Sequence, residues 1–279
     1  MIDFHCHLLP GIDDGPATED EAVEMAAAMQ KAGFTTVHCT PHLIKGSYEA
    51  DNRAVRASLA SLQKRLNDEN IGLNLLPGRE YYLDEYLADY MKDPLPLGET
   101  RFIMIEIPNH RPEQFVKEIC FNVRRSGFIP MIAHPERCDL FAKPSFSASG
   151  SGARNGSGSK LAKYFPFPFK SRFSDRRSAE GAQPGALSPR GKGQSEPGKE
   201  GRPERRGAWH SALLSYLIDL GCAFQANLGS FAAWYGPDVQ QTANYLEKSK
   251  VYTHFGTDLH SRSGLKAIRD SALLKSAVS

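Results

Sequence analysis

The sequence is poor in the features that mark disulfide-bonded, zinc-thiolate and membrane-spanning proteins. Its 279 residues include five cysteines, an odd number with no Cys-x-x-Cys pair, which argues against a disulfide framework and a thiolate zinc site. No stretch approaches the roughly 20 apolar residues that a membrane helix needs. The N-terminus has no basic region followed by an apolar run. We therefore expect a cytoplasmic protein with no membrane insertion and mostly reduced, buried thiols.

The charge is unevenly distributed along the chain. Of the 34 basic and 32 acidic residues, 13 and 5 lie in residues 145–208, which leaves 21 basic and 27 acidic residues elsewhere. The small positive net charge therefore comes from one segment, and the remainder is acidic. A basic balance of this origin does not indicate a nucleic-acid partner, and we expect none.

Residues 145–208 also differ from the rest in composition. They hold 11 of the 24 glycines and 6 of the 18 prolines, with no sustained apolar periodicity. Such a segment cannot bury enough apolar surface to order itself. We expect a disordered, low-complexity basic insertion, with an error at the gene level as the alternative origin.

Outside that segment, helical and strand patterns alternate. Thr18 and Glu21 form a capping box ahead of an apolar helical face. Alternation of this kind predicts a parallel sheet with helical crossovers, and about seven repeats favour a closed barrel. The predicted helices cover 19–32, 51–67, 112–126, 211–220, 238–249 and 264–275, and the predicted strands cover 1–6, 35–40, 73–78, 102–107, 128–133, 223–227 and 251–256.

Histidine and carboxylate residues recur where these strands end. His5 and His7 are two residues apart, so they project from the same side of the first strand. Taken alone, this pair is as consistent with two packed histidines as with a metal site. The recurrence favours a metal centre built at the carboxyl ends of several strands. The other such residues are His42, Glu80, Glu106, His134, Asp258 and His260.

Ordered short motifs contain these residues: His-Cys-His-x-x-Pro-Gly-x-Asp-Asp-Gly-Pro from His5, Thr-Pro-His to His42, Gly-x-Glu to Glu80, Glu-Ile-Pro from Glu106, His-Pro-Glu-Arg from His134, Asn-x-Gly-Ser from Asn227 and Asp-x-His from Asp258. Together they resemble the bacterial capsular and exopolysaccharide tyrosine-protein phosphatases, manganese-dependent enzymes of the polymerase-and-histidinol-phosphatase superfamily. The resemblance covers residues 1–142 and roughly 209–270. It implies one catalytic unit over 1–279, a distorted seven-stranded (β/α) TIM-like barrel. The insertion at 145–208 departs from that pattern.

The resemblance also implies three metal sites with Glu80 as a shared ligand. His5, His7, Glu80 and Asp258 would form the first site; Glu80, Glu106 and His134 the second; Asp14, His42 and His260 the third. Asp13 competes with Asp14, and the family's loop favours Asp14. We expect Mn²⁺, with Fe or Zn as alternatives, because imidazole and carboxylate ligands do not fix metal identity.

Two arginines are candidates for binding substrate phosphate. Arg137 lies three residues after His134, and a guanidinium matches phosphate oxygens bidentately. Arg262 follows His260; for both, a surface salt bridge is the alternative. Arg79 neighbours Glu80 but should point the opposite way along its strand. We expect no metal role for His38, His110, His210 and His254.

The leading hypothesis, implied by the resemblance, is a metal-dependent phosphatase that hydrolyses phosphotyrosine in protein. Its partner would be a bacterial tyrosine kinase that regulates capsule or exopolysaccharide synthesis. One alternative is a phosphatase acting on a small phosphomonoester such as histidinol phosphate, or on a nucleic-acid end. Another is a catalytically impaired metal-binding protein. Glu106 favours the tyrosine phosphatases, since relatives that act on small molecules often have histidine there.

Overall fold

A computed structural model gives the structure of the protein and describes residues 1–142 and 211–269. The predicted helices and strands lie close to their predicted positions within those ranges. The predictions for 145–208, and for the last helix beyond 269, lie outside the described residues. The elements are β1 (Ile2–Cys6), α1 (Glu19–Lys31), β2 (Thr36–Cys39), β3 (His42–Leu43), α2 (Asn52–Asp68), β4 (Asn74–Pro77), β5 (Glu80–Tyr82), α3 (Leu87–Tyr90), β6 (Phe102–Glu106), α4 (Glu113–Arg125), β7 (Ile129–Ala133), the 3₁₀ turns η1 (Pro135–Arg137) and η2 (Asp139–Phe141), α5 (Ala212–Asp219), β8 (Ala223–Asn227), α6 (Leu228–Phe231), α7 (Pro237–Lys248), β9 (His254–Gly256) and α8 (Arg262–Arg269).

The strands form two parallel sheets, ordered β1-β2-β4 and β3-β5-β6-β7-β8-β9. The predicted α/β class is therefore confirmed, whereas a single closed ring of seven strands is not found among the described residues. Two predicted strands, 35–40 and 73–78, are each followed by a further short strand that was not predicted: β3 after a break at residues 40–41, and β5 after a break at residues 78–79. Pro41 has no N–H to donate to a ladder. A Cβ on Gly78 would lie 2.6 Å from a Leu97 methyl, so the backbone packs closely there.

The first and last strands approach each other where the candidate ligands lie. The His7 N–H donates to the Leu259 carbonyl over 2.9 Å, and the Asp258 N–H donates to the His5 carbonyl over 2.7 Å. An isolated parallel bridge joins Cys6 to Leu259. These contacts bring the two ends of the described chain together at one site.

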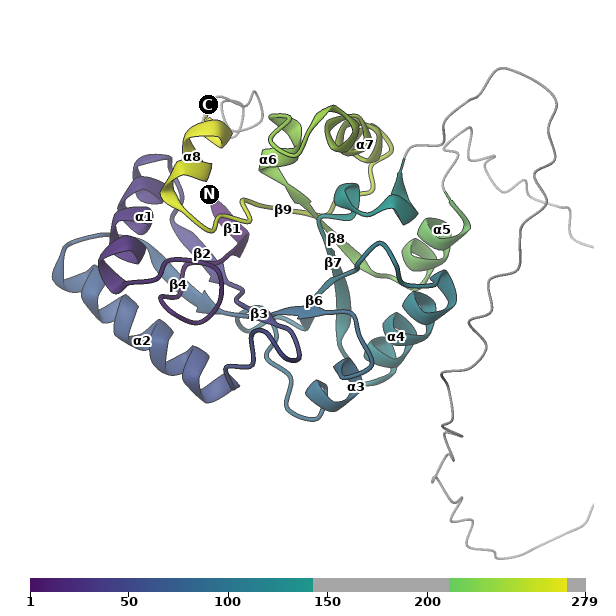
Figure 1. The fold of residues 1–279 in the computed structure, drawn as a ribbon, viewed down its shortest axis with the longest axis horizontal. Helices are drawn as coiled ribbons and strands as arrows, with labels where there is room; N and C mark the ends of the chain where they lie inside the picture. Colours follow the sequence, from purple (N-terminus) through teal and green to yellow (C-terminus); the bar gives the residue numbers. More distant parts are fainter. Residues whose placement is uncertain (143–210, 270–279) are drawn as a thin grey trace, which may run out of the picture. The chain divides into compact units, whose positions relative to one another are not determined.

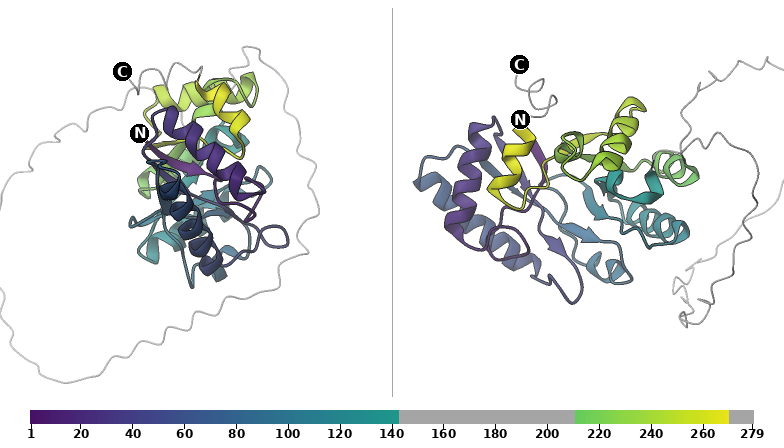
Figure 2. Two further views of the ribbon diagram at one scale, coloured as in Figure 1. Left: turned by 90° about the vertical axis from the view of Figure 1, so that its left-hand side faces the viewer. Right: turned by 45° about the horizontal axis from the view of Figure 1, so that its top comes forward.

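Helices cover the outer side of both sheets (Figures 1 and 2). Helix α1 begins with the predicted capping box of Thr18 and Glu21, and its buried face packs with α2 against β1, β2 and β4. Helices α4 and α5 pack in the same way against β6, β7 and β8. Helix α8 lies beside α1 and adds Leu265 and Ile268 to the first of these cores.

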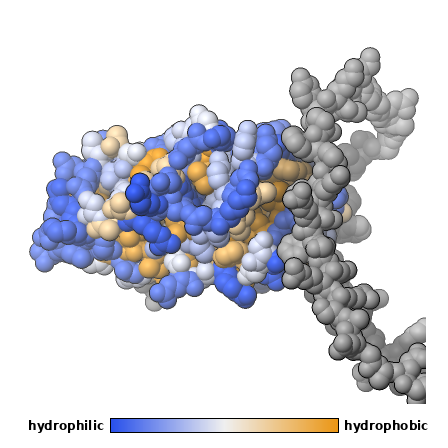
Figure 3. Space-filling view, turned by 90° about the horizontal axis from the view of Figure 1, so that it is seen from below, coloured by the Kyte–Doolittle hydropathy of each residue, from blue (hydrophilic) through white to orange (hydrophobic). Residues whose placement is uncertain are grey.

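The outer surface is mostly polar. In Figure 3, hydrophilic residues cover most of the visible face and hydrophobic residues occupy smaller areas between them. No helix within the described ranges is both long enough and apolar enough to cross a membrane.

Candidate metal centre

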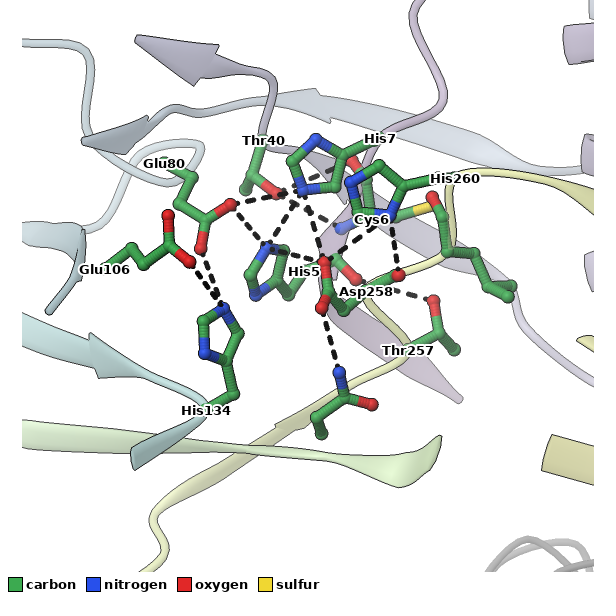
Figure 4. A network of polar contacts seen from close by, with 12 residues as sticks. His5, Cys6, His7, Thr40, Glu80, Glu106, His134, Thr257, Asp258 and His260 are labelled. Atoms are coloured by element: carbon green, nitrogen blue, oxygen red, sulfur yellow. Dashed lines mark hydrogen bonds and ion pairs between the residues drawn. The ribbon is translucent and has the colours of Figure 1, made fainter. Parts of the chain in front are cut away.

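Four buried side chains from strand ends converge at the middle of the site (Figure 4). The Nε2 atoms of His5 and His7 lie 3.1 Å apart. Glu80 Oε2 lies 3.1 Å from the first and 3.2 Å from the second. Asp258 Oδ1 lies 3.3 Å from both. Two imidazole nitrogens and two carboxylate oxygens at these separations can share one divalent cation.

A second group lies beside the first and faces the pocket. Asp14 Oδ1 is 3.3 Å from His260 Nε2 and 3.9 Å from His42 Nε2. The rings of His7 and His260 stack with centroids 3.9 Å apart. Asp14, rather than Asp13, thus offers its carboxylate to His42 and His260.

The third group is built around the opposite side of Glu80. Its Oε1 lies 3.0 Å from His134 Nε2, which is in turn 4.0 Å from Glu106 Oε1. Glu80 Oε2 faces His42 as well, at 3.1 Å from Nδ1. The two oxygens of one carboxylate therefore face different sets of donors. This is the arrangement that a ligand shared between two cations requires.

The two central carboxylates differ in how far protein groups stabilise their charge. Burial by itself would raise the pKa of Glu80, but the imidazoles of His5, His42 and His134 hold that pKa well below its usual range. Burial and the nearby Glu80 carboxylate raise the pKa of Glu106 to about 8. Divalent cations would stabilise both carboxylates in their ionised form.

Two buried atoms at the centre are suited to binding a cation. Glu80 Oε2 and His42 Nδ1 have no hydrogen-bond partner among the described residues, although they lie 3.1 Å apart. Buried polar atoms are nearly always satisfied in folded proteins. A metal ion coordinated by both atoms would satisfy them, so these residues fit a metal centre. Glu80 and His42 also form one candidate metal group with Glu106, whereas the sequence assigns His42 and Glu80 to different sites.

Two residues orient the histidines: Asp13, which the sequence offered only as a competitor of Asp14, and Gln225, which it did not single out. Asp13 Oδ2 accepts a hydrogen bond of 2.6 Å from His7 Nδ1, and Gln225 Oε1 accepts one of 2.8 Å from His5 Nδ1. Each contact leaves Nε2 as the free nitrogen, which faces the carboxylates. Hydrogen bonds of this kind fix the tautomer and ring orientation of metal-binding histidines.

Asp3 ties the first strand to the last loop beneath the site. Its fully buried carboxylate accepts hydrogen bonds from the His5 N–H at 3.1 Å and the Thr257 N–H at 2.9 Å. Burial raises the pKa of Asp3 to about 6 despite these bonds. The contact fixes His5 relative to Asp258, which comes directly after Thr257.

Backbone strain marks two of the candidate ligands. His134 has φ +27° and Asp258 has φ +52°, both in the left-handed region that residues with a side chain rarely adopt. Such conformations cost free energy and persist where the surroundings impose them, often at functional sites. Both residues end strands or follow them directly, where a sharp change of direction aims the side chain at Glu80 and His5.

The two candidate arginines lie in different surroundings. Arg137 Nη1 is 2.6 Å from Asp258 Oδ2, and its guanidinium lies 4.5 Å from the centre of the Tyr235 ring. It lines a pocket of about 330 Å³ together with Asp14 and Glu106. Arg262 is exposed and lies 3.2 Å from Glu24 on α1, in a neighbouring hollow.

The remaining histidines lie away from the three groups. His38 and His254 flank the ring of Phe4, with centroid distances of 5.0 Å and 4.5 Å. His110 is exposed, and His210 lies outside the described residues. Cys6, between His5 and His7 in sequence, points its sulfur toward Met29 Sδ, 3.9 Å away.

Comparison with known proteins places this centre in a family. A family model described as capsular polysaccharide synthesis, CpsB/CapC, matches residues 1–147, more than half of the chain. The chain belongs to this family. The matched range 1–147 contains Asp13 and seven of the nine candidate ligands, so it includes most of the candidate metal centre.

Individual relatives and a solved structure agree with the family match. Tyrosine-protein phosphatase YwqE of Bacillus subtilis (strain 168) is 40% identical over 139 residues, 49% of this chain and 55% of the relative. Tyrosine-protein phosphatase CpsB of Streptococcus pneumoniae is 28% identical over 141 residues, 50% of this chain and 58% of the relative. The chain thus spans about half the length of the curated relatives it matches.

The structural comparison extends over nearly the whole chain. A solved structure from work on YwqE and CpsB, described as unique metal-dependent tyrosine phosphatases, aligns with a TM-score of 0.65 and 25% sequence identity. The alignment covers 99% of this chain and 90% of that one.

Proposed function

We propose that the protein is a metal-dependent phosphatase that hydrolyses phosphotyrosine in protein. The observation that carries the proposal is a cluster of five histidines and four carboxylates, in which Glu80 faces four of the histidines, beside a pocket that Arg137 lines. The family description and the names of the relatives support this reaction. The substrate that fits this context is a tyrosine kinase of the same bacterium that regulates capsule or exopolysaccharide synthesis, in the cytoplasm.

The proposed metal ligands are the nine residues that the sequence predicts. His5, His7, Glu80 and Asp258 would hold one ion, Asp14, His42 and His260 a second, and Glu80, Glu106 and His134 a third. The nitrogen and oxygen donors, with no thiolate, suit Mn²⁺, and Fe or Zn are compatible with the same set.

The chain's own residues account for substrate binding. When bound, the metals would supply Lewis-acid stabilisation and an activated water as the nucleophile. Arg137, half-buried between Asp258 and Tyr235, has its guanidinium fixed by an ion pair and a ring contact. A fixed guanidinium can bind two phosphate oxygens at once and stabilise charge on the phosphoryl group during transfer. Asn227 also donates to Asp258 Oδ2, over 2.9 Å, so the oxygen that pairs with Arg137 has a second donor.

We also propose that the two sheets are an interrupted form of the family's seven-stranded barrel. Strands β2 and β3 are separated by two residues, as are β4 and β5, so nine strands correspond to seven positions. The hydrogen bonds between His5, His7 and residues 258–259 support closure between β1 and β9. The catalytic unit would span 1–279, with 145–208 as an insertion in it.

The test is phosphate release from a phosphotyrosine peptide and from histidinol phosphate, measured side by side with added Mn²⁺. We expect turnover of the peptide to dominate, and Glu80→Ala to abolish it and lower the bound metal measured by elemental analysis, because one ligand serves two ions. Preference for histidinol phosphate would favour the small-molecule alternative. Absence of turnover on both substrates and on p-nitrophenyl phosphate, with metal bound, would favour an impaired binding protein.

A further inference from the structure

We propose that Trp234 binds the aromatic ring of the substrate's phosphotyrosine and so selects aryl over alkyl phosphate esters; this rests on the proposed function. Trp234 lines the same pocket as His42, Glu80 and Arg137. The pocket therefore has a polar end, where a phosphate would lie, and an aromatic wall beside it. A phosphorylated tyrosine has a phosphate attached to an aromatic ring, so its phosphate would lie at the polar end and its ring against the aromatic wall.

The turn that carries Trp234 is fixed to the metal centre. Asn227 caps α6 by accepting from the Gly229 N–H over 2.8 Å, while its Nδ2 donates to Asp258 over 2.9 Å. The Trp234 N–H then donates to the Gly229 carbonyl over 3.1 Å. Three hydrogen bonds thus connect the Trp234 backbone to Asp258, a proposed metal ligand.

Local strain supports a specific placement for this side chain. Ala233, just before it, has φ +58°, a conformation that costs free energy in a residue with a Cβ. The turn closes with the Gly236 N–H donating to the Ala233 carbonyl over 3.0 Å. The strained residue changes the chain direction directly before the two aromatic residues that line the pocket.

Trp234 is 49% exposed, and its ring contacts no other aromatic ring and no cationic side chain in the described parts of the chain. The three other exposed aromatic residues there each have such a contact. Lys45 lies over Tyr86, Arg125 lies over Phe121, and Tyr252 contacts Phe255. An exposed indole that lines a pocket and has an unoccupied face is suited to an aromatic ligand.

Its neighbour Tyr235 serves a different purpose. The Tyr235 ring is occupied by Arg137, at 4.5 Å, and its hydroxyl accepts a hydrogen bond from Asn227 Nδ2 over 3.2 Å. Tyr235 is therefore a positioning residue for the arginine. This leaves Trp234 to contact the ring while Arg137 contacts the phosphate.

The experiment compares Trp234→Ala, Trp234→Phe and the control Phe121→Ala, which removes an aromatic residue of 45% exposure from α4. Steady-state kinetics on a phosphotyrosine peptide would be combined with inhibition by inorganic phosphate. Calorimetry on the Mn²⁺-loaded protein would compare binding of benzylphosphonate and methylphosphonate, so that one readout is independent of turnover.

We expect Trp234→Ala to raise KM for the peptide and weaken benzylphosphonate roughly 3- to 10-fold, the range of one aromatic pair. The value of kcat, inhibition by inorganic phosphate and binding of methylphosphonate should stay within about twofold of wild type. Trp234→Phe should restore most of the loss, and Phe121→Ala should match wild type.

Two results would overturn the inference. One is a benzylphosphonate affinity unchanged by Trp234→Ala; the other is an equal loss for benzyl- and methylphosphonate, which would mean that the site as a whole is disturbed. A wild-type protein without phosphotyrosine turnover would instead refute the proposed function. In that case the phosphonate comparison still decides whether the indole binds aromatic rings.

Discussion

Asp13 offers a sharp test of the metal centre, because it contacts two proposed ligands without being one. Its Oδ2 accepts from His7 Nδ1 at 2.6 Å and from the His42 N–H at 2.9 Å. Its Oδ1 accepts from the Gly15 N–H at 3.0 Å. Burial alone would raise the pKa of Asp13, but the hydrogen bond and charge interaction with His7, together with the bonds from the His42 and Gly15 N–H groups, lower the pKa to about 2. The substitution Asp13→Asn changes the charge and keeps the shape.

The structure determines what the amide would do. The three groups that contact Asp13 all donate hydrogen bonds: His7 and His42 to one carboxylate oxygen, and Gly15 to the other. An Asn side chain has only one acceptor oxygen, so it cannot accept on both sides. With the oxygen toward His7 and His42, the NH₂ group faces the Gly15 N–H. In the other orientation the NH₂ faces His42 and donates to His7 Nδ1, which places the imidazole proton on Nε2. One orientation leaves a buried donor unsatisfied, and the other gives His7 the wrong tautomer for a metal.

The expected losses of metal affinity and of folding stability can both be given as magnitudes. Loss of a group that orients a metal-binding histidine weakens metal affinity by roughly 10- to 100-fold, or about 1.4–2.7 kcal/mol. An unsatisfied buried N–H costs about 1–3 kcal/mol of folding stability. We therefore expect Asp13→Asn to bind Mn²⁺ more weakly by one to two orders of magnitude, and the metal-free protein to unfold at lower urea concentration.

The assay is competition for Mn²⁺ with a chromophoric chelator, combined with urea unfolding of the metal-free protein. The control is Asp20→Asn, which removes the charge of an α1 side chain that is 81% exposed and pairs with Arg65 of α2. Asp13→Asn and Asp20→Asn with the same Mn²⁺ affinity and the same unfolding midpoint would refute the role given to Asp13.

Three further predictions use other parts of the chain. Arg137→Ala should lower kcat/KM on phosphotyrosine peptide by about 2–4 kcal/mol in transition-state terms while bound metal stays at the wild-type level; wild-type kinetics would place the phosphate elsewhere. Burial, helped by His254, lowers the pKa of His38 to about 4. The unfolded chain, with a His pKa near 6.5, then binds more protons between about pH 4 and 6.5, so stability is present above that window and falls by up to about 3 kcal/mol as pH drops through it. Urea unfolding at pH 7 and pH 5 should show a smaller difference for His38→Phe than for wild type. Joining Pro144 to Gly207 should leave metal binding and phosphatase activity intact, since loop length changes closure entropy by only about 0.6 kcal/mol per doubling; loss of activity with metal still bound would show that 145–206 contributes to the site.

The parts of the fold that the sequence predicts well are those fixed by local chemistry. Thr18 and Glu21 satisfy amide groups at the start of α1, so the beginning of the helix follows from the four residues between them, both included. The strands that precede His134 and Asp258 are short apolar segments next to turns, and parallel pairing follows from their alternation with helices. Residue type alone also picks out most of the proposed metal donors, since histidine and carboxylate at a buried strand end have few other roles.

The supporting residues could not be predicted in the same way. Gln225 and His5 are 220 positions apart, and nothing in either neighbourhood marks their contact. Asp13 is adjacent to a better ligand candidate, so sequence reasoning treats it as a competitor to Asp14. Only the folded arrangement shows that Asp13 lies behind His7 while Asp14 faces His42 and His260.

Arg79 connects the interrupted strands to the geometry of the site. The alternation of a strand predicts that it points away from Glu80, and its buried guanidinium indeed donates to the His42 carbonyl over 3.1 Å and to the Ala50 carbonyl. A buried arginine is stable only where its donors are satisfied, so these carbonyl groups must be held in place on the far side of His42. The breaks at residues 40–41 and 78–79 leave β3 and β5 at one edge of the six-stranded sheet, where His42 lies opposite Glu80. The same interruption that divides the sheet therefore gives Arg79 its acceptors and brings an imidazole onto the carboxylate at the centre of the site.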